Sequence, residues 1–161
     1  MIPASQLRDY IIKPVLATLA LPNADAATEL LLATAMQESA CGNMIVQEGG
    51  GPALGVWQME PATHADIWTN FLDFNTVLQA KVGSFLATSG LNMISDSEQL
   101  VGNLYYSCAM ARIQYWRSPD PLPAVGDVDA QAAYYLRVYN AGGKATSAEF
   151  IANWRAVMAD L

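Results

Sequence analysis

Glu38 is the residue with the clearest capacity for chemistry, because a carboxyl group stands where a helical pattern predicts an apolar side chain. Counted from Ala27 at helical spacing, the positions that share this face are Leu31, Thr34, Ala35 and Glu38. Burial disfavours an ionised carboxylate, so we expect the pKa of Glu38 to be raised. A carboxyl group that stays protonated near neutral pH can protonate a glycosidic oxygen. The alternative from helix position alone is a partly buried glutamate that a helix cap elsewhere satisfies.

The segment after Glu38 has the composition of a functional loop. Gly42-Asn43 and Gly49-Gly50-Gly51-Pro52 predict a long flexible connection. An aromatic and polar run, Trp57-Gln58-Met59-Glu60, follows it. Because connections of this kind often carry functional residues, the loop and Glu38 together form a candidate carboxyl-acid site.

Other chemistries lack the residues that they need. With one histidine and no Cys-x-x-Cys pair, the sequence predicts no metal site. It also contains neither a G-x-S-x-G nucleophile elbow nor the Lys-Ser/Thr ending of a phosphate-binding loop after Gly49-Gly50-Gly51.

His64 and Asp66 fall on different faces of a helix, so we interpret His64 as a surface or capping histidine. Cys41 and Cys108 allow one disulfide bond or two half-buried free thiols.

Three short motifs follow one another in an order that resembles a known family. They are Glu38-Ser39, then Leu54-Gly55-Val56-Trp57-Gln58-Met59 with Pro61-Ala62-Thr63, then Tyr139-Asn140-Ala141-Gly142. This order resembles the lysozyme-like superfamily, specifically the branch of soluble lytic transglycosylases and goose-type lysozymes. In that branch an E-S pair ends a helix, G-L-x-Q and P-x-T follow roughly twenty residues later, and a Y-N-A-G turn ends a later helix. The chain departs from this pattern at Val56, Trp57, Glu60 and Gly143-Lys144.

The resemblance implies a peptidoglycan-cleaving enzyme with no cofactor. Glu38 would be the general acid, and afterwards the general base, at the β-1,4 linkage between N-acetylmuramic acid and N-acetylglucosamine. Ser39 would orient Glu38 or cap the loop, and Gln58 would hydrogen-bond the glycan. Tyr139 and Asn140 would close the cleft over Glu38 and hold an acetamido group. From the residues alone, the favoured interpretation is that Tyr139 is a core aromatic and Asn140 a helix-ending residue.

The reaction type depends on whether a second carboxylate faces Glu38. In the resembled transglycosylases one glutamate suffices, because the muramyl 6-hydroxyl attacks and leaves a 1,6-anhydro product, and we expect this reaction. If Glu60 or Asp66 held a water molecule opposite Glu38, simple hydrolysis would result. The default interpretation of Glu48, Glu60 and Asp66 is that they are solvated carboxylates. For Glu60, the expectation that follows from the resemblance is a substrate-binding role.

The elements that would hold these residues are predicted to be helices joined by short connections. The expected helices cover about 5–21 with a kink or break near Pro14, a segment that begins after Asn23 or Asp25, 61–68, 95–117, 129–139 and 146–160. Leu54 to Met59 predicts a short extended segment. The fold class is therefore all-α, or α+β with one small β-hairpin, and the resemblance implies a lysozyme-like single domain over 1–161.

The composition limits the classes of function. A chain of 161 residues is the size of one domain, and 53% apolar with 14% charged residues excludes intrinsic disorder. A net charge of −7 argues against nucleic acid as a ligand. The longest apolar stretches, such as 14–22, are shorter than the roughly 18 to 20 residues that span a bilayer. Asp9 and Pro14 interrupt the apolar run near the N-terminus, which favours an amphipathic first helix over a secretory signal.

The resemblance predicts a phage-type lytic enzyme whose partner is the glycan strand of peptidoglycan. We recognise no wall-binding module, anchor or secretory signal, so we expect such an enzyme to be made in the host cytoplasm or packaged in a virion. It would then reach the wall through a holin-like pore, by cell rupture or by delivery from the virion. Because peptidoglycan itself carries carboxylates, an acidic protein has to bind it through short-range contacts. The alternatives are a non-catalytic, lysozyme-like binding or structural protein, and a helical interaction protein in which Trp116 and Trp154 contact a partner. Most such aromatics build the core.

Overall fold

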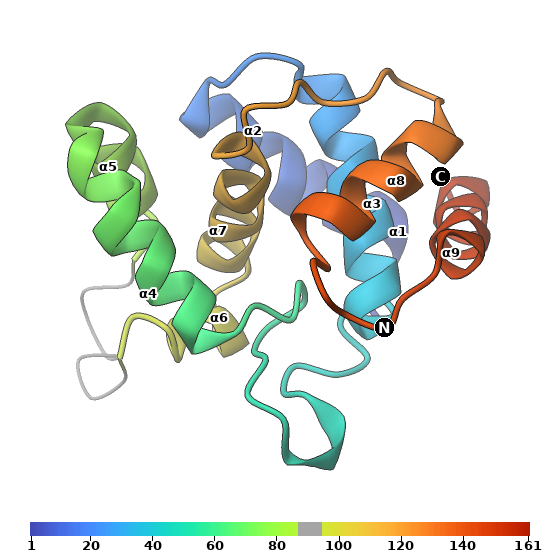
Figure 1. Ribbon diagram of the computed structural model, residues 1–161, viewed down its shortest axis with the longest axis horizontal. Coiled ribbons are helices and arrows are strands. Elements are labelled where there is room, and N and C mark those ends of the chain that lie inside the picture. Colours follow the sequence, from blue (N-terminus) through green and yellow to red (C-terminus); the bar gives the residue numbers. More distant parts are fainter. Residues whose placement is uncertain (87–94) are drawn as a thin grey trace.

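The computed structural model describes residues 1–86 and 95–161, and the regular structure in these ranges is helical (Figure 1). The helices are α1 (Ala4–Gln6), α2 (Lys13–Leu19), α3 (Ala24–Ser39), α4 (Pro61–Asn70), α5 (Thr76–Gly83), α6 (Gln99–Gly102), α7 (Leu104–Trp116), α8 (Val128–Val138) and α9 (Ser147–Ala159). Two short 3₁₀ segments, Glu48–Gly50 and Leu72–Phe74, lie in the connections. Two isolated β-bridges are the only strand-like pairings within the described ranges. The all-α prediction is therefore confirmed at the level of fold class.

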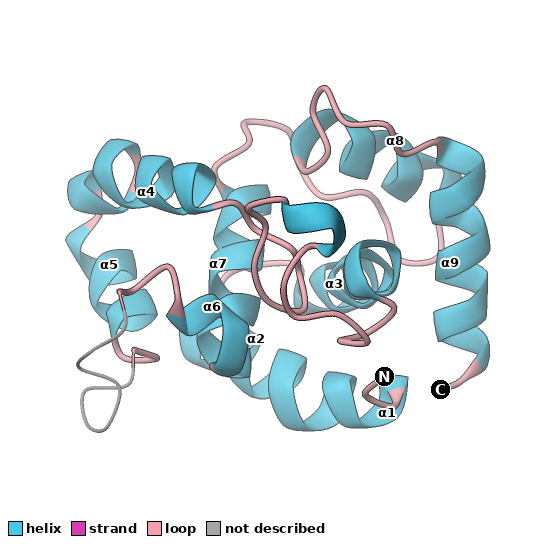
Figure 2. Cartoon of the chain, turned by 90° about the horizontal axis from the view of Figure 1, so that it is seen from below, coloured by secondary structure: helices cyan, strands magenta, loops and turns pink. Residues whose placement is uncertain are grey.

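Helix α3 lies at the centre and contacts α2, α7, α8 and α9. Figure 2 looks along α3 and shows these helices around it. All six residues from Leu30 to Ala35 are buried, so this part of α3 is enclosed on every side and not along one stripe alone. Thr34 tolerates this position because its hydroxyl donates to the Leu30 carbonyl and also bonds the hydroxyl of Tyr115. The enclosed helix fixes the position of Glu38 at its C-terminal end.

The first predicted helix is present over 4–19 and is not broken at Pro14, but it contains a π-helical segment. Residues Leu7–Ile12 between α1 and α2 form this segment, and the N–H of Lys13 donates to the carbonyl of Arg8, five residues back. A wider turn of this kind is compatible with Pro14, which has no N–H to give to the helix. The apolar side of the helix packs into the core through Leu7, Ile12, Val15, Leu16 and Leu19.

The segment from Leu54 to Met59 is a tight turn, so the prediction of an extended segment was wrong. The backbones of Leu54 and Met59 exchange two hydrogen bonds of 3.0 Å, and the four residues between them reverse the chain. The reversal needs left-handed backbone at Gly55 (φ 77°) and Gln58 (φ 45°). Glycine is required at the first of these, because a Cβ there would lie 2.2 Å from the carbonyl oxygen of Leu100.

One continuous helix over 95–117 was predicted, and the structure divides it at Asn103. The bonds of the predicted capping box are present, with Glu98 accepting from the backbone N–H of Ser95 at 2.7 Å, but they precede only the short helix α6. Asn103 leaves helical geometry (φ −100°, ψ 89°) and caps α7 by accepting from the N–H of Tyr106. Its amide nitrogen also donates to the carbonyl of Phe85, a contact between distant segments.

The other predicted helices correspond to observed ones. The segments 61–68, 129–139 and 146–160 match α4, α8 and α9 to within a few residues. The capping box between Thr146 and Glu149 is present in full. Helix α5 was not predicted, although Asn75 caps it with its side chain.

His64 is buried, so the prediction of a surface or capping histidine was wrong. The side chain lies on the inner face of α4, where its Nε2 is 2.6 Å from the hydroxyl of Tyr106 on α7. Trp68, one turn further along α4, donates to the same hydroxyl. Burial lowers the pKa of His64, which is what a neutral ring inside an interhelical network requires.

Buried apolar side chains from all of these helices form one cluster. Trp116 and Trp154 pack against it as partly buried residues, which agrees with the core interpretation of these aromatics. Cys41 and Cys108 are both buried free thiols, so the disulfide alternative does not apply.

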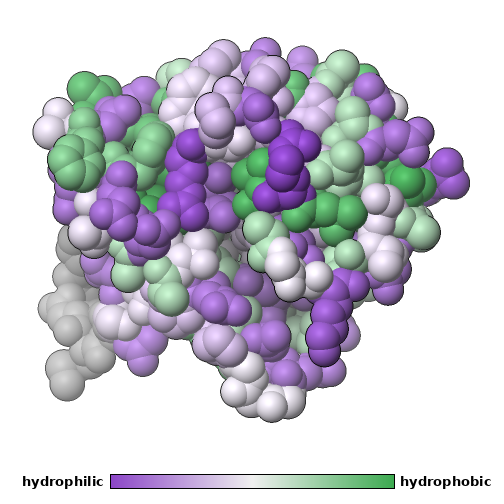
Figure 3. Space-filling model, viewed as in Figure 1, coloured by the Kyte–Doolittle hydropathy of each residue, from purple (hydrophilic) through white to green (hydrophobic). Residues whose placement is uncertain are grey.

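On the face seen in Figure 3, hydrophobic residues are interspersed with hydrophilic ones. Within the described ranges, no helix is both long and apolar enough to cross a membrane.

Candidate active site

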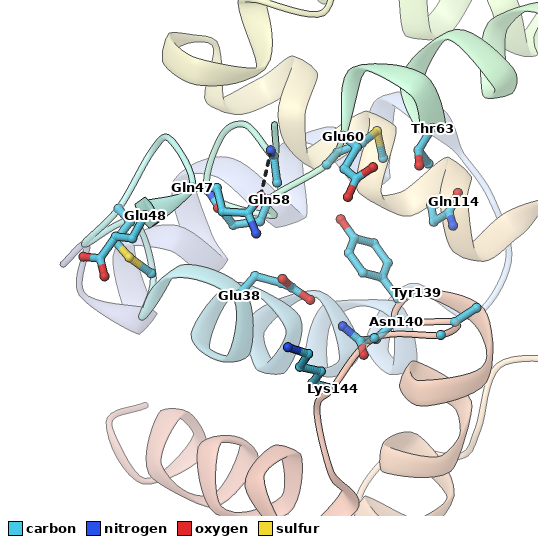
Figure 4. A pocket seen from close by; sticks show the side chains of 16 residues that line it. Glu38, Gln47, Glu48, Gln58, Glu60, Thr63, Gln114, Tyr139, Asn140 and Lys144 are labelled. Carbon is cyan, nitrogen blue, oxygen red and sulfur yellow. Dashed lines mark hydrogen bonds between the residues drawn. The ribbon is translucent and has the colours of Figure 1, made fainter. Parts of the chain in front are cut away.

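A cavity of about 740 Å³ opens beside the C-terminal end of α3. It is walled by the last turn of α3, the loop after it, the Leu54–Met59 turn, the start of α4, the last turn of α7 and the chain that leaves α8 (Figure 4). The sequence-predicted site residues that line it are Glu38, Gln58, Glu60, Tyr139 and Asn140. The structure therefore brings these five together from segments up to about a hundred residues apart.

Glu38 points its carboxyl group into the cavity from the last turn of α3 (Figure 4). Its Oε1 accepts a hydrogen bond of 2.6 Å from the hydroxyl of Tyr135. Burial raises the pKa of Glu38 to about 7, and the bond from Tyr135 opposes part of that rise. The carboxyl group is therefore divided between its acid and base forms near neutral pH, the condition that general acid–base chemistry favours.

Ser39 lies behind the cavity wall and fastens the loop to α3. Its hydroxyl donates to the carbonyl of Val56 at 2.6 Å and accepts from the N–H of Gly42 at 2.8 Å. No hydrogen bond within the described ranges joins Ser39 to Glu38. Of the two roles implied by the resemblance, the contacts agree with capping the loop.

The tight turn is held at two further points, and these place Gln58 at the cavity. The buried indole of Trp57 donates to the Leu31 carbonyl on α3 at 2.9 Å. The Trp57 carbonyl accepts from the hydroxyl of Tyr139 at 2.7 Å. Gln58 uses its amide nitrogen to bond the Gly55 carbonyl, and its side chain faces the cavity across from Glu38 (Figure 4). Trp57 is thus a buried anchor for the turn and does not itself line the cavity.

Tyr139 and Asn140 stand where α8 ends. The N–H groups of both residues donate to the carbonyl of Tyr135, which terminates the helix. The Oδ1 of Asn140 is buried in the cavity wall and has no partner within the described ranges. A Cβ at Gly143 would lie 2.0 Å from this oxygen, so a larger residue there would displace the Asn140 side chain. The turn therefore contains a buried acceptor that is unused within the described ranges.

The three further carboxylates named by the sequence are placed differently. Glu48 and Glu60 line the cavity, and Glu60 lies across it from Glu38 (Figure 4). Asp66 does not line it, because it sits on the outer face of α4 and pairs with Arg117. Only Glu48 and Glu60 therefore remain as candidates for a second carboxylate in this cavity.

Three residues of the site were not singled out from the sequence as functional. Tyr135 bonds Glu38, and the signal that could have found it is its position four residues before Tyr139, on the same face of α8. Gln114 lines the cavity from α7, and its Oε1 is buried without a partner in the described ranges. Lys144 is the one basic residue in the lining. No local pattern marks Gln114, since only the packing of α7 brings it to the cavity.

The cavity holds carboxylates, amides, a phenol and an ammonium group, but no set of metal ligands. Within the described ranges, no group of three or more histidine, cysteine, aspartate or glutamate side chains could hold a metal ion. Known proteins give no further guide, since no family model, curated protein or solved structure matches the chain. The chemistry has to follow from the geometry, which offers proton transfer by one carboxyl group in a cavity lined with hydrogen-bonding amides.

Proposed function

We propose that the chain cleaves peptidoglycan at the β-1,4 linkage between N-acetylmuramic acid and N-acetylglucosamine, as a lytic transglycosylase. The observation that carries the proposal is the environment of Glu38. A partly buried carboxyl group with a pKa of about 7 faces a cavity of about 740 Å³. The resemblance of the three motifs supplies the substrate, and residues from each of the three motifs line the cavity.

In the first step Glu38 acts as an acid. Its protonated carboxyl group gives the proton to the glycosidic oxygen while the bond from that oxygen to C1 of the muramic acid breaks. The leaving sugar departs with a free 4-hydroxyl group. Tyr135 stays a hydrogen-bond donor throughout, because burial and the nearby Glu38 raise the pKa of its phenol.

In the second step the ionised Glu38 acts as a base. It takes the proton of the muramyl 6-hydroxyl group as that oxygen bonds to C1, which closes the 1,6-anhydro ring and restores the acid. This path needs one protein carboxylate only. Tyr135 stabilises the ionised form between the two steps through its 2.6 Å bond.

The cavity also offers groups that suit an acetamido sugar. The side-chain amides of Asn140 and Gln114 line the cavity, and an amide can both donate to and accept from the amide and hydroxyl groups of a sugar. Lys144 supplies a positive charge beside the cavity for the carboxylates that peptidoglycan carries. These short-range contacts offset the repulsion expected between an acidic protein and an acidic polymer.

Hydrolysis is the second candidate reaction, and the position of Glu60 favours it. Glu60 lines the same cavity across from Glu38, where it could activate a water molecule on the other face of the sugar. The product would then carry a reducing end. For either reaction we propose a phage-type role, with delivery to the wall from a virion or through a holin-like pore.

The test compares the wild-type protein with Glu38→Gln on purified peptidoglycan. We expect release of soluble fragments to fall by about 100-fold or more, while co-sedimentation with the insoluble wall is retained. Asp66→Asn is the matched control, since Asp66 is an exposed carboxylate outside the cavity. Absence of release by the wild-type protein, on walls that another muralytic enzyme digests, would favour the non-catalytic binding protein.

A further inference from the structure

Arg112 is a buried cation without a counter-charge, and it lies away from the cavity of Glu38. Its side chain on α7 is 1% exposed. Nη2 donates to the Pro22 carbonyl at 3.3 Å, whereas Nε and Nη1 have no partner in the ranges 1–86 and 95–161. The guanidinium group lies over the ring of Trp116, with 5.4 Å from Cζ to the ring centroid.

The charge of Arg112 is not balanced by the acids around it. Asp120 is the carboxylate that shares its surroundings, and Asp120 is paired with Arg137 at 2.9 Å. Burial lowers the pKa of Arg112 to about 10, which expresses the cost of holding the charge there. A buried charge with unused donors is unfavourable unless an opposite charge comes to it.

A second cavity, of about 390 Å³, lies beside Arg112. Apolar and aromatic groups form much of its wall, namely Trp116, Pro119, Pro121, Leu122 and Tyr134. Its size falls within the range of about 300 to 1,000 Å³ that is usual for small-molecule sites.

The start of α3 meets the same cavity and adds to its positive potential. Asn23, the N-cap residue of α3, lines the cavity, and its side chain makes no capping bond. The first N–H groups of a helix lack partners inside the helix and carry partial positive charge. Asp25 in the first turn is exposed and offsets part of this charge.

We propose that this cavity binds a small organic anion, with its carboxylate or phosphate group beside Arg112 and its apolar part against Trp116 and the segment from Pro119 to Leu122. Guanidinium donors suit the oxygens of both anions. The site is separate from the cavity of Glu38, so the proposal stands whether or not the chain cleaves peptidoglycan.

The test is thermal unfolding with benzoate or phenyl phosphate as the probe, at constant ionic strength, with benzyl alcohol and inorganic phosphate as comparisons. We expect at least one of the organic anions to raise the Tm by about 3 °C or more at a tenfold excess over its Kd. Benzoate and phenyl phosphate distinguish the carboxylate from the phosphate class. No response to either, or an equal response to benzyl alcohol, would overturn the proposal, as would a response to inorganic phosphate alone.

Arg112→Met is the diagnostic variant, because it keeps the volume and removes the charge. We expect it to be at least as stable as the wild-type protein without anion, and to lose the Tm shift. Arg155→Met, an exposed position on α9, should keep the shift. If Arg112→Met does not fold, the wild-type protein still decides: benzoate or phenyl phosphate should move the NMR signals of the Arg112 Nε–H and the Trp116 indole, and unmoved signals would contradict the site.

Discussion

The protonation of Glu38 is set by two opposed influences at its carboxyl group. Burial favours the neutral acid, and the hydroxyl of Tyr135 at 2.6 Å favours the carboxylate. Burial prevails, because the pKa is raised from its usual value of 4.5 to about 7. The sequence predicted the rise from the apolar helix face, but not the phenol that limits it.

A raised pKa makes the stability of the protein depend on pH. The folded state holds the Glu38 proton more tightly than the unfolded state, so this contribution is complete below about pH 4.5 and is lost as the pH rises through about 7. Ionising Glu38 then costs on the order of 3 kcal/mol relative to the unfolded chain. We expect the free energy of unfolding of the wild-type protein, minus that of Glu38→Gln, to fall by that amount between pH 4 and 9 in urea denaturation. A pH-independent difference would mean that the carboxyl group titrates as in water.

Tyr135→Phe tests the opposing hydrogen bond. The phenyl ring keeps the stacking on Phe150, at 4.7 Å between centroids, while the bond to Glu38 is lost. We expect the pKa of Glu38 to rise further, which shifts the alkaline limb of the kcat/KM profile upward and lowers kcat as the ionised intermediate loses its donor.

The control for this variant is Tyr134→Phe. The hydroxyl of Tyr134 donates to the backbone carbonyls of Tyr115 and Asp120, and does not contact Glu38. Its removal should lower stability without moving the pH profile. Equal shifts in the two variants would show that the effect of Tyr135 is general and not a bond to the acid.

At the scale of elements, local signals were readable from the sequence and long-range contacts were not. Asn23, Thr146 and Glu149 mark helix ends through residue type and spacing, and the structure begins α3 and α9 there. The break at Asn103 depends on its bond to the Phe85 carbonyl, a contact that no local pattern contains. The burial of His64 likewise depends on Tyr106, 42 residues away.

The tight turn at the cavity is positioned by α3, and Ser39→Ala tests this. The substitution removes the bond to the Val56 carbonyl and the acceptor for the Gly42 N–H, both at buried or half-buried positions. We expect a loss of about 2–3 kcal/mol in the free energy of unfolding, and faster amide exchange at Gly42.

Ser84→Ala provides the matched control, since Ser84 is exposed and its hydroxyl, among the described residues, bonds only a carbonyl of its own helix. Its loss should change the free energy of unfolding by less than about 0.5 kcal/mol. If Ser39→Ala were equally mild, the turn would not depend on this attachment to α3.

For the whole molecule, the composition and helical patterns were enough to predict an all-α fold. They were not enough to predict the lining of the cavity, because Gln114 and Lys144 reach it only when α7 and the end of α8 are packed around α3. The three motifs predicted part of this lining that composition and helical pattern did not, since Glu38, Gln58, Tyr139 and Asn140 meet at one cavity.

The net charge of −7 gives an expectation for salt dependence. Peptidoglycan carries carboxylates, so protein and polymer repel at long range, and salt screens this repulsion. We expect the rate of fragment release to rise when NaCl increases from about 10 to about 150 mM, where the Debye length shortens to about 8 Å. Walls whose carboxylates have been amidated should show no such rise. A rate that falls with salt on untreated walls would contradict this expectation. It would mean that attraction between Lys144 and the carboxylates of the polymer outweighs the repulsion by the net charge of the protein.

The most direct test of the central claim is mass spectrometry of the soluble fragments that the protein releases from peptidoglycan, run beside Glu38→Gln. The claim requires fragments that end in 1,6-anhydro-muramic acid with the wild-type protein and none with the variant. Reducing ends would contradict the transglycosylase reaction and direct attention to Glu60. Equal release by the variant would contradict the role of Glu38 itself.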